Sequence, residues 1–300
     1  MSRWGWDRCG WLGPLLLGWV ALACGPGTTS SARPTRPVAT IAPVLSHAAA
    51  PPAADEPDAG EAPRLPEAAP DDRLAQEIRE TLVRIATARE LPVKHPVVGR
   101  RLSRDEVLEI IIAKAERDIP REALEAQGDL LRAFELIAVT YDFVGGIYEL
   151  IGDNVAGLYD DDTARMILLD DLDDLVAEQT LAHELVHALQ DQHYDLDRVL
   201  KYQSGHSDRV TAQHALAEGD ATSAMLDVTQ GSAFGMSNDN LRLLMVASVA
   251  LSPGGSQTPR VLQAALVAPY LDGFAFVQEL RRRGGWAEVD RVWQRMPTTT

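Results

Sequence analysis

Cysteine and lysine are scarce in this 300-residue chain, and both absences exclude classes of protein. The two cysteines are Cys9 and Cys24, so the rest of the chain offers no disulfide framework, thiolate metal site or cysteine nucleophile. There are three lysines, and 28 basic residues stand against 44 acidic ones, which gives a net charge of −16. No cluster of Lys and Arg stands out, so we expect no nucleic acid partner, because phosphate contacts require such clusters.

The first 23 residues are typical of a secretory signal peptide. Arg3 and Arg8 precede a short apolar run that ends in small residues. The tripeptide at 21–23 followed by Cys24 resembles a bacterial lipobox, in which the cysteine is lipidated and becomes the mature N-terminus. We therefore predict an exported protein, anchored through lipidated Cys24 to a membrane of the bacterial cell envelope, the outer membrane if the cell is Gram-negative. Ordinary cleavage, giving a secreted or periplasmic protein, is the alternative.

Residues 24–70 predict a linker rather than a folded unit. Ten of the 18 prolines lie between positions 25 and 70, among many alanines and few large apolar residues. Such a segment cannot bury a core, and a proline-rich chain is extended and semi-rigid. We interpret it as a spacer between the membrane anchor and the folded domain.

The folded domain is expected at 71–300, with a helical N-terminal part at 71–150 and an active-site part at 151–300. A capping-box pattern at Ser103 predicts a helix start. Pro120 suits the first turn of a further helix that runs towards Tyr141. The apolar spacing in the second part predicts helices at 174–193, 208–229, 237–251, 260–283 and 286–295.

A β-hairpin is predicted at 155–169, where two short apolar runs flank an acidic turn. The turn begins with Asp160-Asp161-Asp162 but lacks the glycine and distal glutamate of a calcium-binding loop, so we interpret it as a solvated turn. The predicted fold class is α+β, mostly helical, with a small hairpin or sheet.

The segment from His183 to His187 has the pattern HExxH, which is typical of a zinc site on a helix. Residues four apart on a helix lie one above the other, so His183 and His187 can bind one zinc ion. Glu184 lies about 100° around the helix from His183. There it can take a proton from a water held by the zinc and pass it to a leaving amine.

The third zinc ligand has three candidates: Glu218, His193 and His214. His193 follows His183 at the metzincin spacing, but the helix would have to break at Gln190, where glycine is the favoured residue. Glu218 lies on a separate predicted helix, and Gly219 would let that helix pack closely on the HExxH helix. We favour Glu218, which gives two histidines and one glutamate as ligands.

Two segments resemble a family of bacterial zincin-like metallopeptidases of gluzincin type, whose members are often exported or lipoproteins. They are residues 180–192, TLAHELVHALQDQ, and residues 215–221, ALAEGDA. The resemblance runs from about Leu102 to the C-terminus and implies a zincin-like fold with the hairpin beside the HExxH helix. It also implies that His183, His187 and Glu218 hold one zinc ion per chain and that Glu184 is the base. Members of the family continue beyond the position of Pro297, so we expect the family's last segment to lie outside this sequence.

Several further residues are weaker candidates. Asp191 lies on the ligand face of the helix and is either an acceptor for a ligand histidine or a plain helix-end carboxylate. Met225 is interpreted as a core methionine. The residue that stabilises the developing oxyanion is left open among Tyr194, Tyr202, His206, His214 and Tyr270.

Together these patterns predict an exported zinc metallopeptidase that hydrolyses peptide bonds in a peptide or protein substrate. The hairpin would supply an edge strand along which an extended peptide adds. One alternative is a zinc hydrolase of another bond, such as a cell-wall amide. The other is a non-catalytic lipoprotein whose zinc only joins helices.

Overall fold

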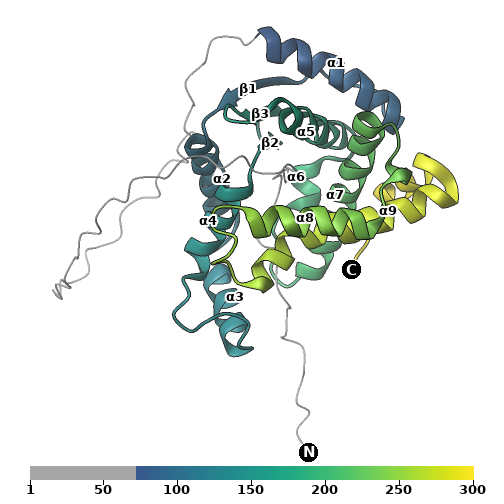
Figure 1. Cartoon of the computed structure of the whole chain (residues 1–300). Coiled ribbons are helices and arrows are strands. Elements are labelled where there is room, and N and C mark those ends of the chain that lie inside the picture. The colour runs from purple at the N-terminus through teal and green to yellow at the C-terminus, as the bar shows by residue number, and fades with distance from the viewer. Residues whose placement is uncertain (1–71) are drawn as a thin grey trace, which may run out of the picture. The chain divides into compact units, whose positions relative to one another are not determined.

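The structure is a computed structural model that describes residues 72–300 (Figure 1). The signal peptide predicted at 1–23 and the linker predicted at 24–70, which begins with Cys24, lie outside the described residues. The described residues are mostly helical with one small sheet, so the α+β, mostly helical class is confirmed.

The N-terminal part contains helix α1 (Asp72–Arg89), strand β1 (Val98–Leu102) and helices α2 (Arg104–Asp118), α3 (Arg121–Ala133) and α4 (Phe143–Asn154). The capping box is confirmed, because the Ser103 side chain and the Glu106 carboxylate each accept a hydrogen bond from the other residue's backbone N–H.

The helix predicted from Pro120 towards Tyr141 ends earlier than expected. Helix α3 ends at Ala133, and Glu135 then adopts a left-handed backbone conformation with φ of 57°. Arg132 donates a hydrogen bond to the Tyr141 carbonyl, which holds the chain in a loop before α4 begins.

The predicted hairpin forms strands β2 (Gly157–Asp160) and β3 (Arg165–Leu169), paired antiparallel with Leu158 opposite Ile167. Strand β1 adds to the other side of β3 in parallel, so the strand order is β1-β3-β2. The hairpin is therefore confirmed, with β2 at an edge of the sheet.

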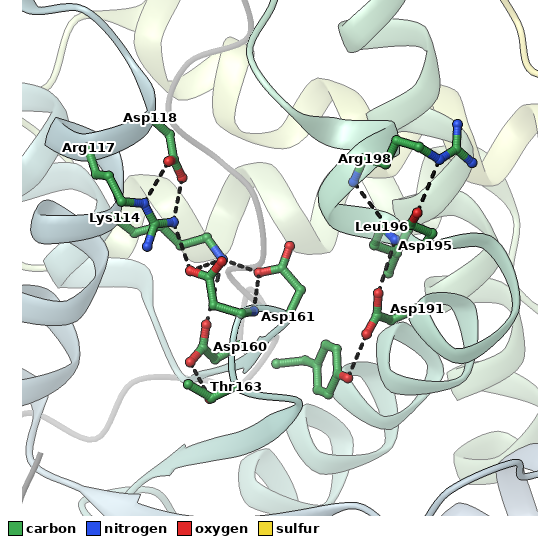
Figure 2. A network of polar contacts seen from close by, with 12 residues as sticks. Lys114, Arg117, Asp118, Asp160, Asp161, Thr163, Asp191, Asp195, Leu196 and Arg198 are labelled. Carbon is green, nitrogen blue, oxygen red and sulfur yellow. Dashed lines mark hydrogen bonds and ion pairs between the residues drawn. The ribbon is translucent and has the colours of Figure 1, made fainter. Parts of the chain in front are cut away.

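The acidic turn of the hairpin is solvated only in part. Asp162, Thr163 and Ala164 are exposed, whereas Asp160 and Asp161 are held against α2, which corrects the sequence interpretation for these two residues. Figure 2 shows Lys114 of α2 reaching into the turn. Its Nζ forms an ion pair with Asp161 and lies 3.2 Å from Asp162 and 3.6 Å from Asp160. The Asp161 side chain is 4% exposed, and Arg117 also pairs with Asp162 at 2.7 Å. The turn is thus attached to α2 by ion pairs that are largely buried at Asp161 and exposed at Asp162.

The C-terminal part is helical, as predicted. It contains α5 (Asp174–Tyr194), α6 (Leu196–Leu200), α7 (Ser207–Gln230), the short 3-10 helix η1 (Ala233–Gly235), α8 (Asn238–Leu251) and α9 (Arg260–Gln294). Within α9 the backbone leaves the helical conformation at Gly284 and Gly285, which matches the boundary predicted between 260–283 and 286–295. Among the described residues, α9 alone has the length and composition of a membrane span, but over half of that window is buried against the rest of the protein.

Helix α5 lies at the centre of these elements. It packs on β2 and β3, on α1 and on α7, and α7 in turn packs along α9 (Figure 1). Helices α7 and α9 cross at two glycines. A Cβ placed on Gly219 would lie 2.7 Å from the Gly273 Cα and closer still to its carbonyl group. Gly219 therefore permits close packing on α9, not on the HExxH helix as the sequence suggested.

A buried ion-pair cluster joins both ends of the described body. Arg89, at the end of α1, is fully buried and pairs with Asp220 of α7 at 2.6 Å and with Asp290 of α9 at 2.7 Å. The Trp293 Nε1–H donates to Asp220 at 2.8 Å, and the Tyr194 hydroxyl donates to Asp290 at 2.9 Å. The cluster fixes α1, α5, α7 and α9 around one point.

Candidate metal centre

Helix α5 carries the HExxH residues into the core. It begins after Asp173, whose side chain accepts a hydrogen bond from the third helical residue. His183, Glu184 and His187 are 4%, 0% and 1% exposed. The opposite face, which includes Leu185, packs in the hydrophobic core. The amphipathic phase of the sequence thus places the motif where α5 meets α7.

Glu218 of α7 completes a compact group of possible metal ligands. The Nε2 atoms of His183 and His187 lie 3.2 Å apart, and Glu218 Oε2 lies 3.0 Å from the first and 3.5 Å from the second. Tetrahedral zinc with bonds of roughly 2.0–2.1 Å needs ligand atoms about 3.3 Å apart. The described group therefore has the size and donor types of three zinc ligands, as the sequence predicts.

The electrostatics of the metal-free group favour metal binding at His183 and Glu218 but not at His187, because the Glu218 charge outweighs burial and raises the pKa of the His187 ring. Burial lowers the pKa of the His183 imidazole below its usual value, which favours the neutral ring that a metal requires. Burial alone would raise the pKa of the Glu218 carboxyl. The charge of His187 and hydrogen bonds from the surrounding histidines outweigh burial and hold that pKa well below its usual range. Glu218 is therefore a carboxylate.

The other two candidate ligands are placed differently. Helix α5 continues without a break through Gln190, and His193 Nε2 lies 2.8 Å from the Pro92 carbonyl oxygen. His214 lies one turn before Glu218 on α7, with its Nε2 3.0 Å from Glu218 Oε1. His214 contacts the carboxylate oxygen that faces away from the two HExxH histidines.

Gln190 contacts the site in a way that the sequence analysis missed. Its Oε1 lies 2.8 Å from His187 Nδ1, and its Nε2 donates to the Ala217 carbonyl at 3.0 Å. The only signal in the sequence is its position three residues after His187. Asp191, by contrast, is not the acceptor for a ligand histidine.

Asp191 instead connects neighbouring elements. Its carboxylate accepts hydrogen bonds from the Tyr159 hydroxyl at 2.9 Å and from the Leu196 backbone N–H at 3.0 Å, and Figure 2 shows the second of these beside the start of α6. Burial first, and then the Asp191 charge, raise the pKa of the Tyr159 hydroxyl, which stays protonated.

Glu184 lies between the ligand group and the edge strand β2. Its Oε2 accepts a hydrogen bond of 2.7 Å from the Tyr159 backbone N–H. The Ala156 carbonyl, just before β2, accepts a hydrogen bond from the Leu169 N–H of β3, so the backbone groups of Ala156 and Leu158 face β3. Because neighbouring backbone N–H groups in a strand point to opposite sides, the Tyr159 N–H lies on the side of β2 away from β3.

Two of the candidate oxyanion donors lie beside the ligand group. The Tyr270 ring centre is 6.0 Å from that of His183, and Tyr270 is buried. His214 contacts Glu218, as described above. Tyr194 is directed elsewhere, because its hydroxyl binds Asp290 in the buried ion-pair cluster.

The remaining candidates are not part of the group. Tyr202 is half-buried and His206 is exposed, and both lie in the loop before α7. Met225 is half-buried and packs against the hydrophobic core, as a core methionine should.

Comparison with known proteins finds no matching family model, no matching curated protein and no matching solved structure. A function therefore has to be inferred from the motif residues and from their geometry.

Proposed function

We propose that this protein is a zinc-dependent metallopeptidase. The observation that carries the proposal is the buried triangle formed by His183, His187 and Glu218, with Glu184 next to His183 on α5. Two imidazoles and one carboxylate are the ligand set of zinc peptidases that keep a fourth position for a reactant.

The residues have distinct roles in the proposed reaction. His183, His187 and Glu218 would hold zinc, which supplies Lewis acidity and makes water a stronger acid. Glu184 takes the proton of the attacking water, whose oxygen forms a bond to the scissile carbonyl carbon. The carbon–nitrogen bond then breaks, and the proton passes from Glu184 to the leaving amine. The Tyr159 N–H orients Glu184 before the reaction.

The edge strand β2 supports a peptide as the substrate. It is the outer strand of the sheet beside α5, and the Tyr159 N–H lies on its outer side next to Glu184. An extended peptide that adds along this side would place its backbone next to the proposed base. For such a peptide to reach the ligand group, the hydrogen bond between Tyr159 and Glu184 has to lengthen or open.

A structural zinc is the second candidate function, because the three ligands are no more than 4% exposed. In that case the metal would join α5 to α7 without catalysis. The ligand geometry is common to both candidates, so activity has to separate them.

The test is the substitution Glu184→Gln in the full chain. Zinc content is measured by elemental analysis, and hydrolysis of a peptide library and of peptidoglycan by mass spectrometry. Glu184→Gln should abolish peptide hydrolysis while zinc stays near one per chain, because Gln cannot accept the proton. The control is Glu178→Gln, on an exposed position of the same helix, which should keep full activity.

Three results would contradict the proposal. Wild-type protein that binds zinc but cleaves neither substrate supports a structural zinc. Cleavage of peptidoglycan alone identifies a cell-wall amide hydrolase. Glu184→Gln that keeps activity shows that Glu184 is not the base.

A further inference from the structure

We propose that Gln190 is a positioning residue of the metal centre, which sets the ring tautomer of His187 and holds Ala217 of α7 beside it. The inference rests on the proposed zinc site. Gln190 does not touch the reacting atoms, so it would act through His187 and through the helix that carries Glu218.

The first step concerns the orientation of the Gln190 amide. The side chain is fully buried, so both of its ends need partners within the protein. One end lies 3.0 Å from the Ala217 carbonyl oxygen, which can only accept a hydrogen bond. This end must therefore be the NH₂ group. The carbonyl end, Oε1, consequently faces His187.

The second step concerns the proton on His187. Gln190 Oε1 can only accept, so the His187 Nδ1 at 2.8 Å must carry the hydrogen. In the neutral ring, the lone pair is then on Nε2. That atom is the one that lies 3.2 Å from His183 Nε2 and 3.5 Å from Glu218 Oε2. Gln190 thus presents the lone pair of His187 to the site where the metal would bind.

The third step concerns α7. Ala217 directly precedes Glu218, and its carbonyl is 27 residues from Gln190 in the chain. A single side chain therefore fixes the ring of one ligand and the backbone next to another. A glutamate at this position could accept from His187 but could not donate to Ala217 when ionised. A methionine could do neither, although its length is similar.

The experiment compares Gln190→Met, Gln190→Glu and the matched control Gln192→Met. Gln192 is two residues further along α5 and binds the backbone of Lys94 and His95, away from the site. Zinc affinity is measured by competition with a chelator. The position of the ring proton on His187 is read by nitrogen-15 NMR, in zinc-loaded protein and in metal-free protein at a pH where the ring is neutral.

We expect Gln190→Met to weaken zinc binding about 10- to 100-fold, the usual effect of removing a partner of a ligand histidine. The Nδ1–H signal of His187 should be lost or should exchange rapidly. Gln190→Glu should keep that signal and lie closer to the wild type in zinc affinity, because a carboxylate still accepts from Nδ1. Gln192→Met should match the wild type in both measurements.

Several outcomes would overturn the inference. Gln190→Met that binds zinc as tightly as the wild type shows that Gln190 does not position a ligand. If Gln190→Glu loses as much zinc affinity and as much Tm as Gln190→Met, then Gln190 only links α5 to α7 and does not control the tautomer of His187. If the wild-type protein does not bind zinc, the proposed function is refuted. The NMR measurement on metal-free protein still identifies the tautomer in that case, and a proton on Nε2 of His187 would refute the inference about Gln190.

Discussion

The crossing of α7 and α9 makes Gly219→Ala a severe substitution. In an ordinary exposed helix position, replacing glycine by alanine stabilises by about 1 kcal/mol. Here the new Cβ would lie 2.7 Å from the Gly273 Cα, and the atoms that it meets are backbone atoms, which cannot rotate away. The carbonyl carbon and oxygen of Gly273 would lie closer still, so the two helices would have to separate by more than ~1 Å to restore ordinary contact.

The expected loss combines stability and metal binding. Overpacking of a well-packed core costs typically about 1–3 kcal/mol, and a clash between two backbones belongs at the upper end. For a body of this size, 3 kcal/mol corresponds to a decrease of roughly 6–12 °C in Tm. Glu218 adjoins the substituted residue, and metal ligands tolerate shifts of only about 0.2 Å. Zinc affinity should therefore fall together with Tm.

The assay is thermal unfolding with and without zinc, together with chelator competition. Gly235→Ala is the control, because a Cβ at Gly235 would meet no atom within 4 Å. This variant should unfold within about 2 °C of the wild type, as a surface change with no strain should. A Gly219→Ala protein with wild-type Tm and zinc affinity would refute the argument that the two backbones are in contact.

Two further predictions follow from the ligand group and the ion-pair cluster. Glu218→Ala should lose most zinc affinity and all activity. His193→Ala should keep its metal, because His193 binds a backbone carbonyl outside the site. If Glu218→Ala kept zinc and His193→Ala lost it, the assignment of the third ligand would be reversed. Arg89→Met should destabilise by about 3–5 kcal/mol in urea unfolding, because it leaves the buried Asp220 carboxylate without its cation. A loss below about 1 kcal/mol would indicate that Asp220 is satisfied without Arg89.

The helices that carry the site could be predicted because their signals are local. Helix α5 is marked by a capping residue and by apolar residues at helical spacing, so the predicted range 174–193 differs from the observed one by one residue. The hairpin is also local, since its strands are joined by a short turn. The HExxH ligands follow directly, because their geometry is a property of one helix.

Features that depend on distant partners could not be predicted. Strand β1 contains two arginines and is largely half-buried, so it lacks the alternation that marks a strand, and its partner β3 lies more than sixty residues later. Helix α4 contains two adjacent glycines, Gly145 and Gly146, which suggest a loop until tertiary packing supports the helix. The role of Gln190 depends on Ala217, and nothing in the sequence shows that this carbonyl lies opposite it.

The buried ion-pair cluster has a consequence for the order of events during synthesis. Arg89 is translated early, whereas Asp290, which pairs with Arg89, and Trp293, which donates to Asp220, are translated about two hundred residues later. The cluster that they complete contains Asp220, two residues after Glu218. A ribosome releases the HExxH helix well before these partners exist. We therefore expect a nascent chain stalled before Asp290 to hold zinc weakly and to cleave nothing. In the proposed peptidase, metal binding and activity would then arise only after residues 290–293 have been synthesised and have packed around Asp220.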